Sequence, residues 1–209
     1  MIGPALLGEI VRPICRLINI VLGKPRIEKL IKRKPRKIIV GASGVFQRGW
    51  VSIEKEFLNL LRPEDWKRYF LENSIDAILA EHVWEHLTRE EGILAAKLCY
   101  RYLKPGGYLR VAVPDGLHPD LDYIERVRPG GFGYSSWDHK LIYTHKTLKE
   151  IFELAGFRIE LLEYFDEKGL FHYKEWNPTD GMIRRSKRFD IRNRKGKLKI
   201  ISIILDANK

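Results

Sequence analysis

Strand-like and helix-like patterns alternate along the sequence from residue 38 onward. Short runs rich in β-branched and other apolar residues occur at 38–40, 51–53, 75–79, 108–113, 157–164 and 198–205. Helical patterns lie between them at 89–103 and 146–155, and the first of these stops at Lys-Pro-Gly-Gly, a sequence that ends helices. This alternation is typical of α/β folds. We therefore expect one α/β domain over residues 37–209, with a mostly parallel sheet and helices on both faces.

The first 36 residues have a different pattern. Apolar side chains recur at helical spacing from Ile10 to Val21, and Arg12 and Arg16 lie on the opposite face, which predicts an amphipathic helix. These charges interrupt the apolar run that a membrane span or a signal peptide requires. The segment is a basic N-terminal extension, which could contact an anionic membrane surface or dock on the chain's own domain or on a second subunit.

The basic residues are concentrated near the two ends of the sequence. Residues 1–37 contain ten Lys and Arg against two Glu, and residues 181–199 contain nine against one Asp, in a chain of net charge +11. Such segments suit a membrane surface, nucleic acid or an acidic partner. Nucleic acid is the less favoured partner because few aromatic residues are interleaved with these charges. The two cysteines have no metal-ligand spacing, which fits a cytoplasmic protein, with membrane association through the extension as an alternative.

A short glycine-containing turn follows the first predicted strand. The turn is Gly41-Ala42-Ser43-Gly44, and Glu54 follows the second predicted strand. A turn of this kind lets backbone N–H groups approach a ligand, and the acid can accept hydrogen bonds from a ribose. The third glycine of the dinucleotide fingerprint is absent, and the acid comes ten positions after Gly44 rather than about twenty. The pattern argues against NAD or FAD and fits a ligand that has a ribose without a phosphate.

Three segments together resemble a known family. They are residues 40–50, residues 75–87 with Glu-His-Val-Trp-Glu-His-Leu at their end, and residues 102–109 around Lys-Pro-Gly-Gly. In this order they resemble the Rossmann-like, class I S-adenosylmethionine-dependent methyltransferases, in particular a bacterial group of predicted methyltransferases. The resemblance covers residues 37–207. It implies a Rossmann-like methyltransferase fold and S-adenosylmethionine as the cofactor.

The resemblance also assigns roles to individual residues. It places the glycine turn under the methionine part of the cofactor, Glu54 at the ribose and Asn59 near the adenine. It places Glu81 and His82, which follow the predicted strand 75–79, beside the methyl donor. The implied cofactor-binding residues are Gly41, Ser43, Gly44, Glu54, Asn59, Glu81 and His82. The turn departs from the family's fuller Gly-x-Gly-x-Gly.

Methyl transfer from a sulfonium needs alignment, and it needs a base when the nucleophile carries a proton. The candidate catalytic residues are His82, Asp115 and His139. His82 and Asp115 follow predicted strands, where α/β sheets bind ligands. His139 belongs to the glycine-rich stretch 128–140, which we expect to form a mobile lid carrying Tyr134 and Trp137. The alternatives are a structural His82, an Asp115 that caps a turn, and an ordered loop in which Asp138 caps the next helix.

His82 and His86 flank Glu85 at a spacing that on one helix would form part of a zinc motif. No third ligand is evident from the sequence, so we expect no metal. The expected activity is methyl transfer to a small-molecule or glycan acceptor, such as a saccharide or another small hydroxyl compound. A nucleic-acid methyltransferase and a non-catalytic cofactor-binding or scaffold protein are the alternatives. The sequence makes no prediction of oligomeric state.

Overall fold

The computed structural model describes residues 36–133, 135–193 and 196–209. The predicted amphipathic helix in the N-terminal extension and the predicted substrate contact of Tyr134 lie outside the described residues.

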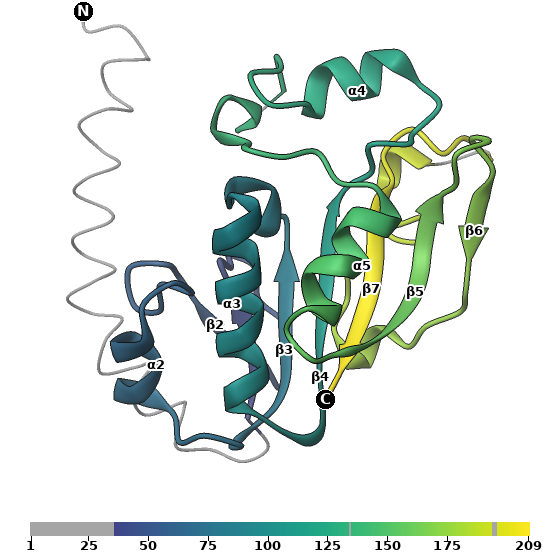
Figure 1. Ribbon diagram of the computed structural model, residues 1–209. Helices are drawn as coiled ribbons and strands as arrows, with labels where there is room; N and C mark the ends of the chain where they lie inside the picture. Colours follow the sequence, from purple (N-terminus) through teal and green to yellow (C-terminus); the bar gives the residue numbers. More distant parts are fainter. Residues whose placement is uncertain (1–35, 134, 194–195) are drawn as a thin grey trace, which may run out of the picture.

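Within the described residues the strands form one mixed, seven-stranded sheet with the order β2-β1-β3-β4-β7-β5-β6 (Figure 1). The strands are β1 (Lys37–Val40), β2 (Val51–Ile53), β3 (Ile75–Glu81), β4 (Leu103–Pro114), β5 (Arg158–Phe165), β6 (Phe171–Tyr173) and β7 (Ser202–Asn208). The first four in this order pair in parallel, whereas β7 is antiparallel to both β4 and β5. The expected Rossmann-like sheet is confirmed, but it is mixed rather than mostly parallel, because its last strand is inserted antiparallel between β4 and β5 and because β5 and β6 pair antiparallel.

Four α-helices accompany the sheet in the part of the chain that the structure describes. They are α2 (Pro63–Tyr69), α3 (Arg89–Tyr102), α4 (Leu121–Val127) and α5 (His145–Glu153). The sequence predicted α3 and α5. At the start of α3, Thr88 and Glu91 form a reciprocal capping box, which satisfies two backbone N–H groups that the helix leaves free.

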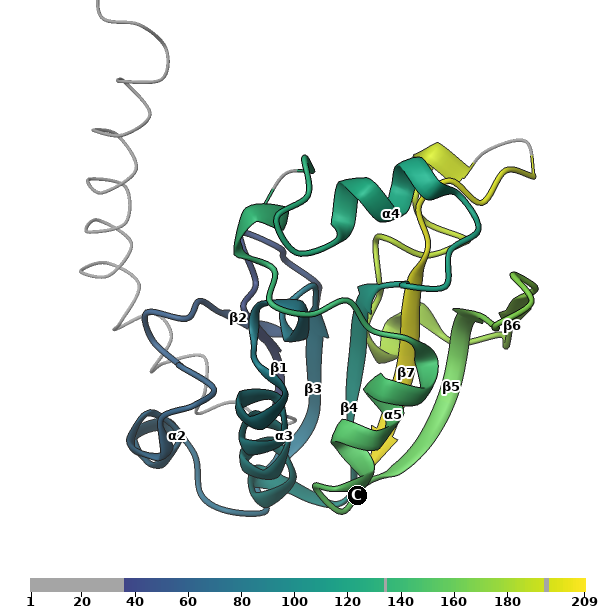
Figure 2. The ribbon, with the colours of Figure 1, turned by 45° about the horizontal axis from the view of Figure 1, so that its top comes forward.

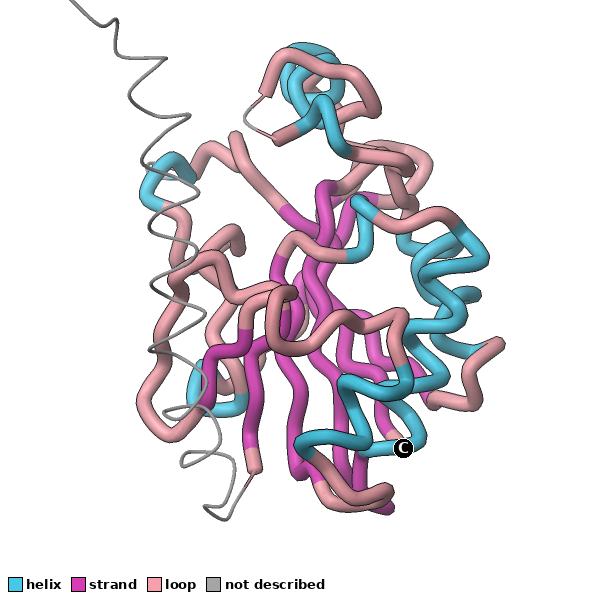
Figure 3. The backbone as a smooth tube through the Cα atoms, turned by 90° about the vertical axis from the view of Figure 1, so that its left-hand side faces the viewer, coloured by secondary structure: helices cyan, strands magenta, loops and turns pink. Residues whose placement is uncertain are grey.

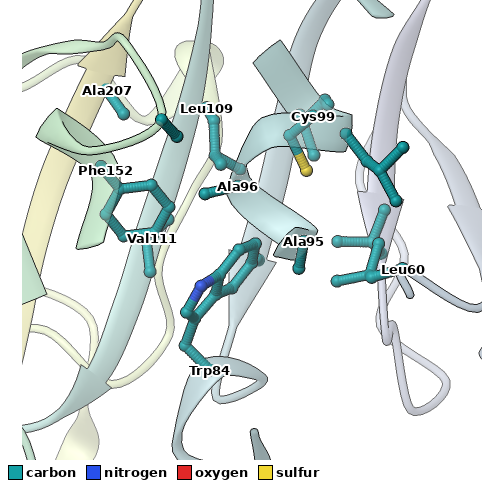
Figure 4. Packing of buried hydrophobic residues seen from close by; sticks show 14 of the residues in the cluster. Leu60, Trp84, Ala95, Ala96, Cys99, Leu109, Val111, Phe152 and Ala207 are labelled. Atoms are coloured by element: carbon teal, nitrogen blue, oxygen red, sulfur yellow. The ribbon is translucent and has the colours of Figure 1, made fainter. Parts of the chain in front are cut away.

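Side chains alternate between the two faces of the sheet, as the pleat of a strand requires. Ile38 and Val40 of β1 belong to the larger core cluster, and Ile39 between them belongs to the smaller one. Helices α3 and α5 cover the larger cluster, where the indole of Trp84 packs 5.1 Å from the ring of Phe152 (Figure 4). This arrangement explains the near-continuous apolar runs in the central strands.

The opposite face differs from the expectation of helices on both faces. Its smaller core cluster is closed by Trp50, Trp176 and Ile183, which come from loops and from the irregular stretch 174–193. Figure 3 shows the sheet from the side, with the longer helices gathered against one face. The stretch 174–193 lacks a sustained apolar period and contains Pro178 and Gly181, so it covers the face with single side chains and 3₁₀ turns rather than with a helix.

A buried ion pair fixes this irregular stretch to the sheet. The Arg110 guanidinium on β4 makes a two-pronged contact with Asp206 on β7, at 2.7 and 2.8 Å. Its Nη1 group donates to the carbonyl oxygens of Asn177 and Gly181. The arginine is only 3% exposed, and these four acceptors compensate the loss of its water.

Candidate active site

The chain order places a ligand site at one edge of the sheet. From β1 the chain moves to β2 on one side and then returns to β3 on the other side. Such a switch in strand order opens a crevice at the carboxyl ends of the strands, where α/β proteins bind ligands. The segments that follow β1, β2 and β3 therefore border the crevice. In Figures 1 and 2, α4 and the loop that follows it lie beyond the carboxyl ends of β3 and β4.

The structure brings the glycine turn and Glu54 together. Ser43 and Gly44 donate their backbone N–H groups to Oε2 and Oε1 of Glu54, each at 3.0 Å. Both turn residues have left-handed backbone angles, with φ of 45° and 78°. The turn thus orients the carboxylate, and each carboxylate oxygen keeps lone pairs for a further donor.

Gly41 links the turn to the segment that follows β3. A Cβ atom at this position would lie 2.8 Å from Cγ2 of Val83, closer than carbon atoms pack, and the backbone has a φ of +57°. Only glycine fits here without displacing a neighbour. The turn after β1 and the segment after β3 are consequently in direct contact.

Asn59 shapes the start of α2. Its side-chain oxygen accepts the N–H of Leu61, and its own N–H donates to a carboxylate oxygen of Asp65. These contacts form a turn before the helix. Its predicted place near the adenine remains a prediction.

Glu81, the last residue of β3, binds the irregular stretch. Its Oε1 accepts the N–H of Arg185 at 2.9 Å, and its Oε2 lies 3.5 Å from Nε of Arg184. Glu81 therefore holds residues 184 and 185 at the carboxyl edge of the sheet. The two arginines, with Phe189 and Arg192, line an open pocket at this edge.

His82 stands between two polar partners. Its Nδ1 lies 2.8 Å from Oε1 of Glu85, and its Nε2 lies 3.1 Å from Oγ of Ser202. Burial alone would raise the pKa of Glu85, but the adjacent His82 holds that pKa below its ordinary value. A carboxylate that orients an imidazole in this way is a recurrent arrangement for a catalytic base.

The helical pairing of His82 and His86 does not form. The helix here, η1 (Trp84–His86), is a single 3₁₀ turn, and His82 precedes it with a left-handed φ of 59°. The two imidazoles therefore do not share a helix face. The zinc motif that their spacing resembles is absent from these residues.

Asp115 is completely buried and functions as a turn cap. Its two carboxylate oxygens accept the N–H groups of Leu117 at 2.9 Å and Phe165 at 2.7 Å. Burial raises the pKa of Asp115 to about 6. These bonds match the alternative in which Asp115 caps a turn rather than acting as a base. They leave the carboxylate turned away from solvent.

His139 follows a second 3₁₀ turn, η2 (Ser136–Asp138). Its Nδ1 lies 2.7 Å from the carbonyl oxygen of Val127, and burial lowers its pKa. The suggestion that Asp138 caps the next helix is wrong, because Thr144 caps α5 through a box with Thr147. Trp137 is exposed, as a contact to an acceptor would require, and the expected mobility of the loop remains a prediction.

One grouping was not visible in the sequence. Glu85, His86 and His139 each offer a ligand atom, and these atoms all lie within 4.8 Å of one another. The third member comes from a loop more than fifty residues further along the chain. No local spacing could have revealed it.

The comparison with known families agrees with this geometry. Residues 54–111 match the model of a methyltransferase domain. Over this segment the match agrees with the resemblance to methyltransferases drawn from the sequence. The matched methyltransferase segment begins at Glu54, contains Glu81 and His82, and ends within β4.

Solved structures of methyltransferases are similar at low identity. A SAM-dependent methyltransferase of Archaeoglobus fulgidus is 18% identical, with a TM-score of 0.48 over 90% of this chain and 93% of that one. A SAM-dependent methyltransferase of Thermotoga maritima, described as a possible histamine N-methyltransferase, is 13% identical, with a TM-score of 0.49 over 93% and 97%. No curated protein matches the chain significantly. Among the described residues, no helix has the length and apolar character needed to cross a membrane.

Proposed function

We propose that this methyltransferase domain transfers a methyl group from S-adenosylmethionine to a small acceptor that carries a hydroxyl group. The observation that carries the proposal is the position of Glu54 at the switch point, where the glycine turn holds its carboxylate. The ribose of the cofactor carries two adjacent hydroxyls, which match the two carboxylate oxygens. The glycine turn offers a close approach to the rest of the cofactor.

Calorimetric titration of the full chain with S-adenosylmethionine and S-adenosylhomocysteine tests the cofactor. Glu54→Gln should lose on the order of 1–3 kcal/mol of binding free energy, because hydrogen bonds to a charged acceptor are removed. Glu90→Gln, an exposed position in the first turn of α3, is the matched control and should bind as the parent does. Equal affinities of the parent and Glu54→Gln would remove Glu54 from the site.

His82 is the favoured base for the acceptor hydroxyl. Its Nδ1 faces the Glu85 carboxylate, so a proton taken by the imidazole would be stabilised by a neighbouring buried charge. Asp115 is less suited because both oxygens accept backbone N–H groups in the interior. His82→Gln should lower kcat by about 10²-fold or more in a steady-state methylation assay, as expected when a base is lost.

The pocket beside Glu81 favours an acceptor that also bears an anionic group. Arg184 and Arg185 line it together with Phe189, Asp190, Ile191 and Arg192. Arg192 is already paired with Asp190, so Arg184 and Arg185 are the arginines that would bind a phosphate or carboxylate. We favour an acidic or phosphorylated saccharide. A methylation panel of such sugars, neutral sugars and short RNA and DNA oligonucleotides would separate the classes. Product with the oligonucleotides alone would establish the nucleic-acid alternative instead.

Membrane contact through the N-terminal extension is a separate part of the proposal, supported by the ten basic residues in 1–37 and the apolar period within them. The full chain should sediment with anionic vesicles and less so at high salt. A chain that starts at Arg36 should stay in the supernatant. Equal sedimentation of both chains would end this part of the proposal.

A further inference from the structure

Three potential metal ligands meet beyond the carboxyl end of β3. Glu85 and His86 belong to η1, and His139 follows η2 in the loop before α5. Their ligand atoms lie within 4.8 Å of one another, and the two imidazole rings meet edge to face with centroids 4.9 Å apart. Two unconnected segments thus contribute to one cluster.

The carboxylate of Glu85 is the unusual member of this cluster. The residue is completely buried, and among the described residues its Oε2 has no hydrogen-bond partner. Its Oε1 lies 2.8 Å from Nδ1 of His82, so Oε2 is the oxygen without a hydrogen-bond partner. A buried, unpaired carboxylate oxygen is costly, and coordination to a metal ion is one of the ways in which proteins compensate it.

The two histidines are oriented as metal ligands usually are. Nδ1 of His139 lies 2.7 Å from the carbonyl oxygen of Val127, and Nδ1 of His86 lies 3.3 Å from that of Asp138 and 3.4 Å from its carboxylate. An Nδ1–H that donates to such an oxygen fixes the tautomer. The Nε2 lone pair of each ring is then available to a metal ion.

We propose that Glu85, His86 and His139 bind a first-row divalent transition-metal ion such as Zn²⁺. Two imidazoles and one carboxylate, with a fourth position open to water or to an acceptor oxygen, form a common catalytic ligand set. Ligands at the Zn²⁺ bond length of about 2.1 Å sit about 3.4 Å apart in a tetrahedron, so the side chains close by roughly 1 Å on binding. Mg²⁺ and Ca²⁺, which prefer oxygen ligands, do not suit this set.

The test uses the full chain without a histidine tag and does not depend on methyl transfer. Titration with Co²⁺ should give visible absorption bands that saturate at one equivalent per chain, and Zn²⁺ should displace them. Glu85→Gln, His86→Gln and His139→Gln should each weaken Zn²⁺ binding about tenfold or more, comparable to the loss of groups that orient metal ligands. Mg²⁺ in excess should leave the spectrum unchanged.

His172→Gln is the matched control, because it removes an imidazole that pairs with Asp166 away from the cluster. It should bind Zn²⁺ as the parent does. A footprint on the parent chain avoids reliance on folded variants: Zn²⁺ should protect His86 and His139, but not His172, from acylation by diethyl pyrocarbonate. The proposal would be overturned if Co²⁺ gave no saturable spectrum or if His172→Gln lost as much Zn²⁺ affinity as the cluster variants. It would also be overturned if Zn²⁺ left His86 and His139 open to acylation.

Discussion

Gln47 and Met182 exchange two hydrogen bonds although 135 residues separate them in the sequence. The amide Nε2 of Gln47 donates to the Met182 carbonyl at 2.7 Å, and the Met182 N–H donates to Oε1 at 2.9 Å. A buried side-chain amide here pairs with a peptide group much as a neighbouring strand would. The exchange attaches the loop after β1 to the stretch that covers the second face of the sheet.

Gln47→Glu should destabilise the fold. The substitution replaces the donor that faces the Met182 carbonyl with an acceptor, so two oxygens oppose each other in a buried site. We expect a loss of about 1–3 kcal/mol in the free energy of unfolding, measured by urea denaturation. The exposed neighbour Arg48 provides the control, since Arg48→Ala should stay within about 0.5 kcal/mol of the parent. A stability equal to the parent's would show that the exchange contributes nothing.

Gly41→Ala should weaken both stability and cofactor binding. The new Cβ meets Val83 at 2.8 Å, and the left-handed φ adds a strain of about 1–2 kcal/mol. Adding Val83→Ala to this variant should restore the stability lost through the contact with Val83. The stability lost through backbone strain should not return. Thermal unfolding and titration with S-adenosylhomocysteine measure the two effects. A double variant no better than Gly41→Ala would argue against the contact.

Asp206→Asn should be among the most destabilising single changes. It removes the negative charge that pairs with the guanidinium of Arg110, which is buried between β4 and the irregular stretch. Breaking a buried pair by removing one partner costs about 3–5 kcal/mol. Glu150→Gln breaks the exposed pair with Arg89 and should cost less than about 1 kcal/mol, which makes it the control. Similar losses in the two variants would contradict the structural role assigned to Arg110.

Asp115 should make stability depend on pH in the acid range. Its pKa is about 6 in the folded chain and about 3.9 in an unfolded one. Between these values the folded chain holds a proton that the unfolded chain has lost. The contribution of this group to the free energy of unfolding therefore falls as pH rises from about 4 to about 6 and is constant above that.

Comparison of Asp115→Asn with the parent isolates this contribution. In the variant, the fall in the free energy of unfolding between pH 4 and pH 6 that Asp115 causes should be absent, whatever the overall stability of the variant. Urea unfolding at several pH values from 4 to 8 measures both chains. Parallel curves across this range would show that Asp115 titrates with the same pKa in the folded and unfolded chains.

Local signals in the sequence were sufficient for the main helices and strands. Helix α3 has its capping box at one end and Lys-Pro-Gly-Gly at the other, so its bounds follow from nearest neighbours in the chain. Helices α2 and α4 have seven residues each, two turns in which an apolar period hardly repeats. They depend on contacts that the fold supplies, such as the burial of Trp66, and were not predicted.

Some contacts of the candidate site could likewise be predicted from the sequence, and others could not. The meeting of the glycine turn with Glu54 could be predicted because both follow neighbouring parallel strands, whose carboxyl ends lie at one edge. The contacts of Glu81 with Arg185 and of Glu85 with His139 join segments that are distant in sequence. Their pairing is decided by how the loops cover the sheet, which depends on the packing of the whole chain.

The central position of β7 has a consequence for the order of folding. This strand hydrogen-bonds to β4 on one side and to β5 on the other, so within the described chain β5 and β6 join the rest of the sheet only through residues 202–208. During synthesis, β1 to β4 leave the ribosome about ninety residues before their last partner. Until then β4 presents an unpaired edge to other chains, and the sheet closes by a long-range contact, which is a slow step in folding.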